Sequence, residues 1–569
     1  MLNYILGLNS IGFNTSASIF KDGKLIAAIE EERLTRKKRT RNFPVNAIKF
    51  CLETANISLD NLDAIAISWN PLINLEKFEN NISSNISYIP SILSSTINYI
   101  LRDIKNYNKD YFVQNIYLKN KKKIKIYFVN HHLSHASMFY LSGYKEANIL
   151  TTDAFGENKC VGFYHGKGRS LKSISSQNFP HSLGSFYSTF TEYCGFKPQS
   201  EEWKLMGASA FGKKSKFYVK IRNLVSFDKS SNNFYLNLKY FNHYMFHRPK
   251  YYNKELIKYL SLKPNLLGKN LSKNYFDLAY ASQKVFEEIY LYLINKTHSI
   301  SQSKNLVVAG GCALNCVANG KIKNNSKYKN IFIPPVPDDS GAGLGAALYV
   351  QNSIKKKPLK INTFNNFLGP SFKNNEILIA LKKYKIKFEF FKNIEHQAIQ
   401  SIIKGKIIAW FQGRLEFGDR ALGNRSILAD PRQKLIKNKI NKIIKYREFF
   451  RPFAPAILED KVSEYFENAQ SSYYMEKALV IKKNKRKLIP SVTHVDGTGR
   501  LQTVNKKLNN KFYNLIHEFY KETNIPLLLN TSFNVQGEPL VASISDAIKN
   551  FYLSGLDELY IGNFKIKKK

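Results

Sequence analysis

The sequence predicts an α/β protein with more than one domain. Its 569 residues are too many for a single hydrophobic core, and 44% of them are hydrophobic, which is enough for globular packing. Short apolar segments of strand length alternate with segments that have helical spacing. One strand–turn–strand pattern near the N-terminus also recurs near residue 150. These observations favour a duplicated N-terminal domain followed by a second α/β domain.

The first elements define the type of N-terminal fold. Residues 4–8 have the composition of a strand, and a small polar turn follows them. Asp22-Gly23 is a strong hairpin signal between two apolar runs. A helix at 46–55 and a strand at 64–69 come next. The order strand, polar turn, strand, hairpin, strand is typical of the opening of an RNase H-like, actin-like ATPase half, in which the first turn faces phosphate.

The second half of this domain is expected to begin near Ile124. Residues 149–168 repeat the layout of residues 4–24. Beyond them the sequence predicts a helix, a loop that bears Lys and Gly, a long helix, two strands and a Gly/Ala-rich helix, at residues 182–196, 201–212, 277–299, 305–309, 331–335 and 341–350.

We place the N-terminal domain at residues 1–350, a linker rich in lysine and asparagine at 351–367, and the second domain at 368–569. Within the first domain, residues 75–120 are assigned to helices and residues 213–275 to an insertion or lid. The helices and strands expected in the second domain are residues 377–383, 407–412, 436–444, 527–529, 544–553 and a last strand at 559–566.

The formal net charge of +43 indicates either a polyanionic partner or compositional drift. The lysines are scattered, as at residues 121–123 and 355–357, and do not form one basic, aromatic-rich motif. We therefore favour drift combined with small anionic substrates over binding of nucleic acid.

The cysteines and the hydropathy pattern indicate a reducing, cytoplasmic location. The five cysteines form no CxxC pair, so neither a disulfide framework nor a zinc ribbon is indicated. The N-terminus lacks a basic leader with a cleavage signal. Residues 88–101, the most apolar stretch, are too short and too polar to span a bilayer.

His131 and His135 stand four residues apart, a spacing that places two imidazoles on one helix face as ligands of one metal ion. Such histidine pairs also occur on helix surfaces, or in protein cores where other residues complete their hydrogen bonds. Asp153 follows an apolar strand beside a glycine turn, where α/β proteins place ion and phosphate ligands. Asp339 also follows a strand and is a candidate third ligand; the alternative is an N-cap of the helix after it.

Gly310-Gly311 follows a buried strand. A double glycine there lets backbone N–H groups approach a nucleotide closely, and Asn315 could hydrogen-bond to it. A simple tight turn is the alternative for the glycine pair.

Five cations of the second domain lie in loops rich in glycine, proline and aromatic residues. Guanidinium groups in such loops suit a compact anion such as a carboxylate or phosphate. The alternative is ion pairing with nearby acidic residues, and we favour anion binding. The five are Arg420, Arg425, Lys445, Arg451 and Arg500. The chain has no GxSxG elbow, no Walker A motif and no GxGxxG after a strand, so covalent Ser/His/Asp catalysis has no support.

These motifs run nearly from end to end of the chain. The most specific strings are DGKLIAAIEEERLTRKK, HHLSHA, DAFGE, SLGSFYSTFTEYCGF, KLMG, GGCALNCVANGKI, PPVPDDSGAGLGAA, GDRALGNRS, REFFRPFAPA, HVDGTGRLQTV and NTSFNVQGEPLV. With them the chain closely resembles the ATP-dependent O-carbamoyltransferases of the NodU/CmcH type.

The resemblance implies an N-terminal ASKHA-type domain that binds ATP over a metal, usually iron, with magnesium or manganese as alternatives. It also implies a C-terminal YrdC-like domain that takes carbamoyl phosphate. The family makes carbamoyl-adenylate and passes the carbamoyl group to an acceptor hydroxyl, commonly on a sugar. The sequence does not define the oligomeric state, and a homodimer is one alternative.

Matching motifs imply roles for individual residues. The metal ligands would be His131, His135 and Asp339, with Asp153 at the metal or phosphates. The nucleotide site would be lined by Lys204, Gly207, Gly310, Gly311 and Asn315. Carbamoyl phosphate would be held by Arg420, Lys445, Arg451 and Arg500.

Two positions depart from the family pattern. The first turn has Phe13-Asn14 where members usually carry His-Asp. The family pattern therefore does not identify the group that activates the acceptor hydroxyl, and the candidates are Asn14, His132 and Asp153. Gln536 stands where some members have arginine.

Two other functions stay as alternatives. One is a tRNA threonylcarbamoyl-adenosine enzyme, against which the RPFAP and NTSFN strings argue. The other is a non-catalytic glycan- or nucleic-acid-binding protein. Hydrogenase maturation carbamoylation is disfavoured, because its zinc-finger cysteines are missing from this sequence.

Overall fold

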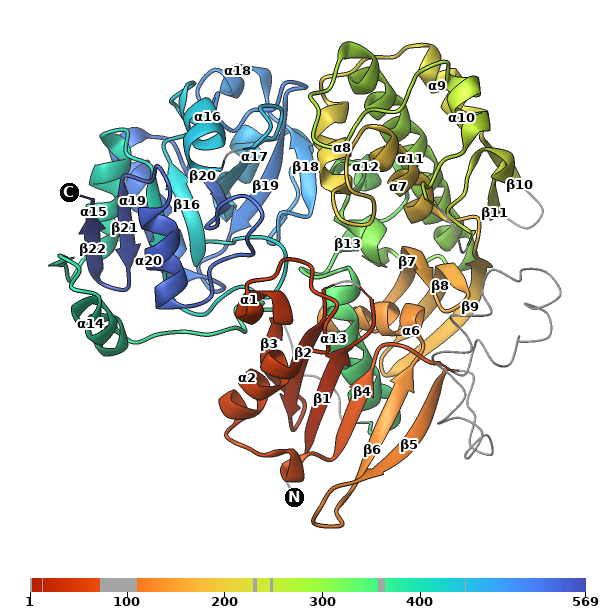
Figure 1. Ribbon diagram of the computed structural model, residues 1–569, viewed down its shortest axis with the longest axis horizontal. Coiled ribbons are helices and arrows are strands. Elements are labelled where there is room, and N and C mark those ends of the chain that lie inside the picture. The colour runs from red at the N-terminus through yellow and green to blue at the C-terminus, as the bar shows by residue number, and fades with distance from the viewer. Residues whose placement is uncertain are drawn as a thin grey trace. The chain divides into compact units, whose positions relative to one another are not determined.

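The computed structural model of the protein shows a chain that divides into two compact units (Figure 1). The first unit contains Met1–Glu31, Arg39–Leu314 and Ile322–Phe364, and the second contains Glu32–Lys38, Asn315–Lys321 and Asn365–Lys569. Two short segments that precede residue 365 in the sequence therefore belong to the same unit as the C-terminal residues. The structure describes residues 3–12, 14–71, 110–228, 233–245, 249–356, 364–445 and 447–568.

The first sheet of the first unit has the strand order β3-β2-β1-β4-β6-β5. Its first three strands form an antiparallel meander, and β4 and β6 run parallel to β1. Helix α2 (Val45–Ala55) packs on β2 and β3. The strands are Tyr4–Asn9, Ser16–Lys21, Lys24–Glu30, Ala64–Ile67, Tyr111–Tyr117 and Lys123–Val129 for β1 to β6.

The second sheet repeats this arrangement with the order β13-β12-β7-β8-β9. Strands β7, β8 and β9 form the antiparallel meander, and β12 and β13 are parallel to β7. The shared order confirms the predicted duplicated RNase H-like architecture. These strands are Glu146–Gly156, Lys159–Lys167, Ser170–Asn178, Asn305–Ala309 and Asn330–Phe332 for β7, β8, β9, β12 and β13.

The second half begins at β7, so the predicted start near Ile124 is wrong. Ile126 of β6 pairs with Ile65 of β4, which makes β6 a strand of the first sheet. The assignment of residues 75–120 to helices is also wrong for 111–117, which form β5, and residues 72–109 of that stretch lie outside the described part of the chain.

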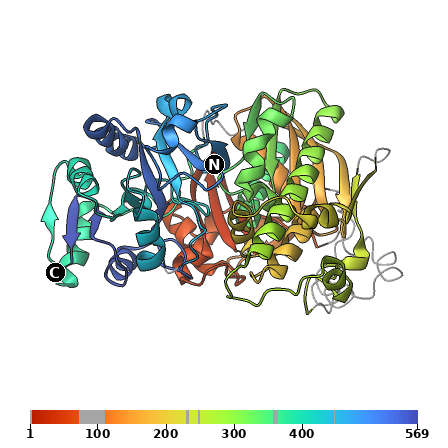
Figure 2. The same cartoon turned by 90° about the horizontal axis from the view of Figure 1, so that it is seen from above.

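Helix α8 (Glu202–Ser209) replaces the loop that was predicted for residues 201–212. Its Leu205 and Met206 are buried, and the helix packs on α7 (Leu183–Tyr193) and the long helix α11 (Lys273–Ile300). Tertiary packing therefore overrides the glycine-rich local sequence. Helices α7 and α11 also pack on strand β7 of the second sheet, and Figure 2 shows the green helices beside the orange strands of this unit.

Helix α13 (Asp339–Tyr349) packs on both β1 and α6 (His131–Ala136) because its glycines allow close approach. A Cβ added to Gly343 would lie 2.3 Å from the nitrogen of Asn9, and one added to Gly345 would lie 1.9 Å from the oxygen of Ser134. Larger residues at these positions would separate α13 from the elements that it touches.

The predicted insertion at 213–275 is folded where it is described. It contains helix α9 (Lys216–Arg222), the hairpin β10 (Val225–Asp228) and β11 (Asn233–Leu236), and helix α10 (Lys254–Leu260). Residues 229–232 and 246–248 are outside the described part.

The second unit contains a nine-stranded sheet with the order β14-β22-β21-β15-β16-β20-β17-β19-β18. Its core includes Trp410 and Tyr560, both fully buried. The last strand predicted at 559–566 is instead a hairpin, because Gly562 takes a positive φ of 55° between β21 and β22. The strands are Glu389–Phe390, Ile408–Phe411, Arg425–Ala429, Ala454–Leu458, Lys477–Val480, Thr498–Val504, Leu527–Ser532, Glu558–Ile561 and Phe564–Lys567 for β14 to β22.

Helices connect the strands of this sheet. Two further helices, α1 (Glu31–Thr35) and α12 (Cys316–Asn325), follow strands of the first unit in the sequence, and each contributes residues to the second unit. The remaining helices are Asn374–Lys383, Ile394–Ile403, Ile436–Lys439, Val462–Tyr465, Lys483–Arg486, Asn510–Thr523 and Ile544–Tyr552 for α14 to α20.

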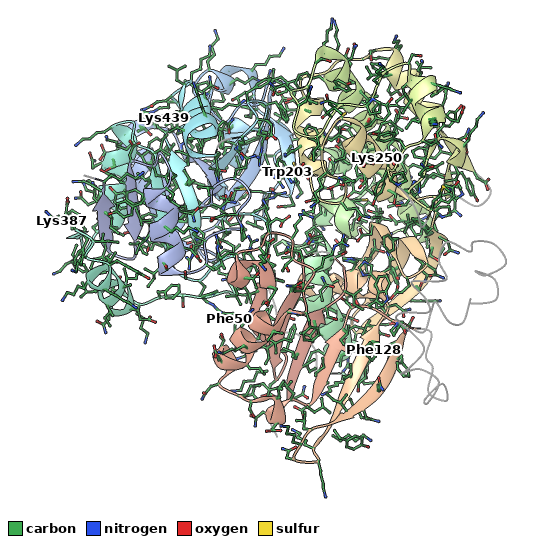
Figure 3. The ribbon with its side chains drawn as sticks, viewed as in Figure 1. Phe50, Phe128, Trp203, Lys250, Lys387 and Lys439 are labelled. Carbon is green, nitrogen blue, oxygen red and sulfur yellow. The ribbon has the colours of Figure 1, made fainter. Side chains whose placement is uncertain are left out.

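The positive charge is spread over the surface. Lys387 and Lys439 extend outward from the second unit in Figure 3, and both are exposed. Such scattered lysines are consistent with compositional drift. Among the described residues, no helix is long and apolar enough to cross a membrane.

The predicted linker at 351–367 is only partly described. Its first residues continue α13 as a π-helical turn, Val350–Ile354, and residues 357–363 lie outside the described part.

Candidate metal centre and anion site

Two histidines of the first unit face each other on helix α6. The Nε2 atoms of His131 and His135 lie 3.1 Å apart, as the four-residue spacing on a helix requires. Both side chains are buried, with exposed fractions of 4% and 0%. Two Nε2 atoms at this distance can share only one proton, so a cation between them satisfies both lone pairs.

Two carboxylates complete this cluster. Asp153 lies in β7, and its Oδ2 is 3.2 Å from the Nε2 of His135. Asp339 opens α13, and its Oδ1 is 3.5 Å from the Nε2 of His131. The four ligand atoms all lie within 4.8 Å of one another.

Asp339 is the first helical residue and not the N-cap. The N-cap position belongs to Asp338, and its side chain makes no capping hydrogen bond. The capping alternative for Asp339 is therefore wrong, and its carboxylate is directed to the histidines.

The electrostatics of the cluster suit a divalent cation. Burial alone lowers the pKa of His135, but Asp153 and Asp339 offset this effect and raise that pKa to about 9. Burial opposes ionisation of Asp153, yet its contacts with His131 and His135 hold the pKa of Asp153 well below its usual range. Two imidazoles with two carboxylates form a donor set that fits iron, manganese or another divalent first-row metal.

The glycine pair contacts this cluster directly. The backbone N–H of Gly311 donates to Oδ2 of Asp153 at 3.1 Å, and that of Ala154 donates to Oδ1 at 2.7 Å. Gly310 has a φ of +91°, and a Cβ there would lie 2.2 Å from the oxygen of Thr152. The pair therefore forms a tight turn that orients Asp153, and its role at a nucleotide stays a prediction.

Glu157 holds the start of α6, and the sequence alone did not reveal this role. Its Oε1 accepts hydrogen bonds from the backbone N–H groups of His131 (2.9 Å) and Asn70 (2.8 Å). The DAFGE string was a signal for this residue, since an acid that follows a glycine turn can reach a neighbouring helix N-terminus.

Gly156 offers the first test of this geometry. A Cβ at this position would lie 2.3 Å from Cδ2 of His131. We expect Gly156→Ala to displace the imidazole and to weaken metal binding by about 10-fold or more. Metal competition with a chelator measures this loss. Gly168→Ala is the control, since a Cβ there meets nothing within 4 Å and its cost is confined to backbone strain at a φ of +56°; equal metal affinity in the two variants would contradict the prediction.

Two of the three predicted catalytic residues lie beside members of the cluster: His132 follows His131 in the chain, and Asn14 contacts the residue after Asp339. The Nδ1 of His132 is 2.8 Å from the hydroxyl of Thr151, and burial and the neighbouring histidines hold the pKa of His132 well below its usual range. Asn14 has a φ of 57°, and its Nδ2 donates to the Oγ of Ser340, the residue after Asp339. Phe13 lies outside the described residues. Asp153, the third predicted catalytic residue, is part of the metal cluster.

The predicted nucleotide residues fall in two places. Lys204 and Gly207 lie on α8, where Lys204 is buried, pairs with Glu201 at 2.6 Å and lies over the ring of Trp203. Asn315 belongs to the second unit, and its Oδ1 accepts from the backbone N–H of Ala318. Asn315 is therefore assigned to the second unit, and the glycine pair to the first.

A group of cations lies in the second unit around Lys445. The Nζ of Lys445 donates to Oδ1 (2.6 Å) and the backbone oxygen (2.8 Å) of Asn534 and to both oxygens of Ser532. Burial, together with Arg447, Arg451 and Lys38, holds the pKa of Lys445 well below its usual range. Several positive charges at one buried place favour an anion there.

Arg447 belongs to this group, although sequence reasoning did not select it. Its Nε donates to Oδ1 of Asn441 at 2.7 Å, and its guanidinium lies over the ring of Phe453 at 4.6 Å. Its Nη2 is buried and has no acceptor among the described residues. Burial and Arg451 disfavour its charged form and lower its pKa. A bound anion would relieve both effects.

The other predicted cations differ in their surroundings. Arg451 pairs with Glu448 at 3.5 Å. Arg500, on β19, donates from Nε to the oxygen of Met475 at 2.7 Å. Arg420 is half-buried in the loop between β15 and β16.

Arg425 does not fit the anion-binding prediction. It is fully buried, its ring contact with Phe411 is 3.6 Å, and its guanidinium donates to the backbone oxygens of Gln412, Gly413 and Pro370. Nη1 and Nη2 thus join two backbone segments, whereas the buried Nε has no acceptor among the described residues. These surroundings favour a structural role for Arg425 over the predicted anion binding.

A stability measurement tests this assignment. We expect Arg425→Ala to lower the free energy of unfolding by about 3–5 kcal/mol, because several buried carbonyl groups lose their donors. Urea unfolding measures the change. Arg432→Ala is the control, since Arg432 is exposed and pairs with Asp430; a loss below about 1 kcal/mol for Arg425→Ala would contradict the structural role.

The fold and these two sites define a two-unit α/β protein whose duplicated unit contains a cluster of candidate metal ligands. The chain belongs to the carbamoyltransferase family. The model of the carbamoyltransferase N-terminus matches residues 4–348, and that of the carbamoyltransferase C-terminus matches residues 399–568. These matches confirm the family resemblance.

Relatives of similar length extend over the whole chain. An uncharacterized protein of Synechocystis sp. is 36% identical and covers 100% of this chain and 97% of its own length. The nodulation protein NolNO of Sinorhizobium fredii is 33% identical over 99% of this chain and 80% of its own. An uncharacterized protein of Methanocaldococcus jannaschii is 32% identical over 99% of both.

Proposed function

We propose that this protein is an ATP-dependent O-carbamoyltransferase that forms carbamoyl-adenylate and transfers the carbamoyl group to a hydroxyl of a sugar-containing acceptor. The observation that carries the proposal is the cluster of His131, His135, Asp153 and Asp339 within a chain of the carbamoyltransferase family. Such a cluster suits the binding of a metal with a nucleotide polyphosphate.

The four side chains would hold a divalent metal, with iron favoured and magnesium or manganese as alternatives. When bound, the metal would supply Lewis-acid stabilisation to phosphate oxygens. The chain itself supplies the orientation: Gly311 fixes Asp153 through its N–H, and Glu157 fixes the helix that carries both histidines. For ATP we propose contacts from Lys204, Gly207, Gly310, Gly311 and Asn315.

The cations of the second unit would receive carbamoyl phosphate, and a YrdC-like fold for this unit stays part of the proposal. The predicted Arg420, Lys445, Arg451 and Arg500 are joined here by Arg447. Their positive charges would neutralise the phosphate as it leaves the carbamoyl group. Formation of one carbamoyl-adenylate from ATP and carbamoyl phosphate consumes one water and releases one phosphate and one pyrophosphate.

The acceptor hydroxyl must lose its proton as it attacks the carbamoyl carbon and AMP leaves. Asn14 carries an amide and cannot serve as a base. Asp153 is committed to the two histidines. His132 keeps a buried Nε2 that has no partner in the described part of the chain, and it is the base we propose.

Pyrophosphate release tests the function. Full-length protein is mixed with ATP, carbamoyl phosphate and iron, magnesium or manganese, with and without candidate sugars. We expect pyrophosphate that depends on carbamoyl phosphate, and carbamoylated product with the correct acceptor. Absence of pyrophosphate under every metal and acceptor would overturn the proposal.

A further inference from the structure

The segment Glu32–Lys38, which we call the strap, packs with the second unit although it lies near the N-terminus of the sequence. It coincides with the EERLTRKK string, to which the function above assigns no role. Two of its arginines contact loops of the second unit: one of these loops carries Arg420, and the other holds Lys445 through Asn534.

The first contact is made by Arg33. Its side chain is buried, with 4% exposed, and its Nη2 donates to the backbone oxygen of Gly418 at 2.8 Å. Gly418 has a φ of +125° and lies two residues before Arg420. Arg33 therefore fixes the backbone of the loop that carries Arg420.

The second contact is made by Arg36. Its Nη1 donates to the oxygen of Leu540 at 2.6 Å, and its Nη2 donates to that of Pro539 at 2.8 Å. The same guanidinium pairs with Glu538 at 3.3 Å and Asp546 at 3.4 Å. Four contacts in this planar arrangement fix the 538–546 loop to the strap.

This loop in turn holds Lys445. The backbone oxygen of Glu538 accepts from Nδ2 of Asn534 at 2.7 Å, and Oδ1 of Asn534 accepts from Nζ of Lys445 at 2.6 Å. A continuous set of contacts therefore runs from Arg36 through Glu538 and Asn534 to Lys445.

The end of the strap adds charge at the same place. Lys38 is exposed, and its positive charge is one of those that lower the pKa of Lys445. Its neighbour Lys37 is also exposed, but it is not among the charges that lower the pKa of Lys445.

We propose that the strap is a component of the anion site: Arg33 and Arg36 position the loops around Arg420 and Lys445, and Lys38 contributes a further positive charge to the bound phosphate group. The inference rests on the proposed function, because it assumes that this site receives carbamoyl phosphate. Arg33 and Arg36 are positioning residues, whereas Lys38 acts on the anion electrostatically.

The test uses full-length protein with the variants Arg36→Gln, Arg36→Lys, Lys38→Gln and Lys37→Gln. Calorimetric binding of inorganic phosphate and the KM values for carbamoyl phosphate and ATP are the readouts. We expect Arg36→Gln to weaken phosphate binding about 10-fold and Lys38→Gln about 5-fold, with KM for ATP unchanged. Arg36→Lys should recover part of the loss, and Lys37→Gln should stay within about 2-fold of the wild type.

Thermal unfolding of each variant shows whether it is folded, and the split between the two KM values separates positioning from general loss of structure. The inference is overturned if the wild type binds phosphate and releases pyrophosphate while Arg36→Gln and Lys38→Gln match Lys37→Gln. In that case the proposed function stands. If the wild type itself releases no pyrophosphate and binds no phosphate, the proposed function is wrong, and the inference, which depends on it, is wrong as well.

Discussion

Replacing His135 with alanine is expected to remove the proposed metal ion and to abolish the proposed carbamoyl transfer. His135 is fully buried and its Nε2 contacts both Asp153 and Asp339, so its removal takes one donor from the centre of the cluster. Loss of one of four ligands is expected to weaken metal affinity by at least about 100-fold. The metal content per chain after purification, and its exchange with a chelator, measure the effect directly.

His132→Gln is the matched control for this experiment. It changes the same residue type on the same helix, but the side chain of His132 contacts Thr151 and lies outside the four-ligand cluster. Glutamine can keep a hydrogen bond to Thr151, so we expect full metal content and a loss of acceptor transfer only. Full metal content in His135→Ala would show that the cluster does not hold the metal.

The sequence was sufficient to predict much of this cluster. The spacing of His131 and His135 gives their common helix face, and the position of Asp339 after a strand gives a third ligand. The sequence could not show how close α13 comes to α6, because that depends on the contacts of Gly343 and Gly345 with other elements. The support from Glu157 was missed for the same reason, since its acceptor role depends on where α6 begins.

The second unit shows where residue type alone misleads. Arg425 opens strand β16 and Arg447 lies outside the regular elements, and their residue type alone does not distinguish them. The difference lies in the terminal nitrogens: Nη1 and Nη2 of Arg425 donate to backbone carbonyl groups, whereas Nη2 of Arg447 has no acceptor in the described residues. Similarly, the KLMG string was predicted as a loop, and packing on α11 makes it a helix.

Arg447→Ala carries the largest expected effect on the anion site. The variant removes a buried guanidinium that Asn441 and Phe453 hold in place with one nitrogen unused. We expect binding of carbamoyl phosphate to weaken by about 2–3 kcal/mol, roughly 30- to 150-fold. Steady-state KM for carbamoyl phosphate and calorimetric binding of inorganic phosphate both report this change, and metal content should stay at the wild-type level.

Two further variants show whether the geometry or only the charge of Arg447 matters. Lysine keeps the charge but not the planar set of donors, so Arg447→Lys is expected to recover less than half of the lost binding free energy. Arg432→Gln removes an arginine whose guanidinium is already paired with Asp430, and it should leave phosphate affinity within about 2-fold of wild type. Equal losses in Arg447→Ala and Arg432→Gln would mean that net charge alone attracts the anion. A specific binding site would instead lose affinity only when an arginine that contacts the anion is removed.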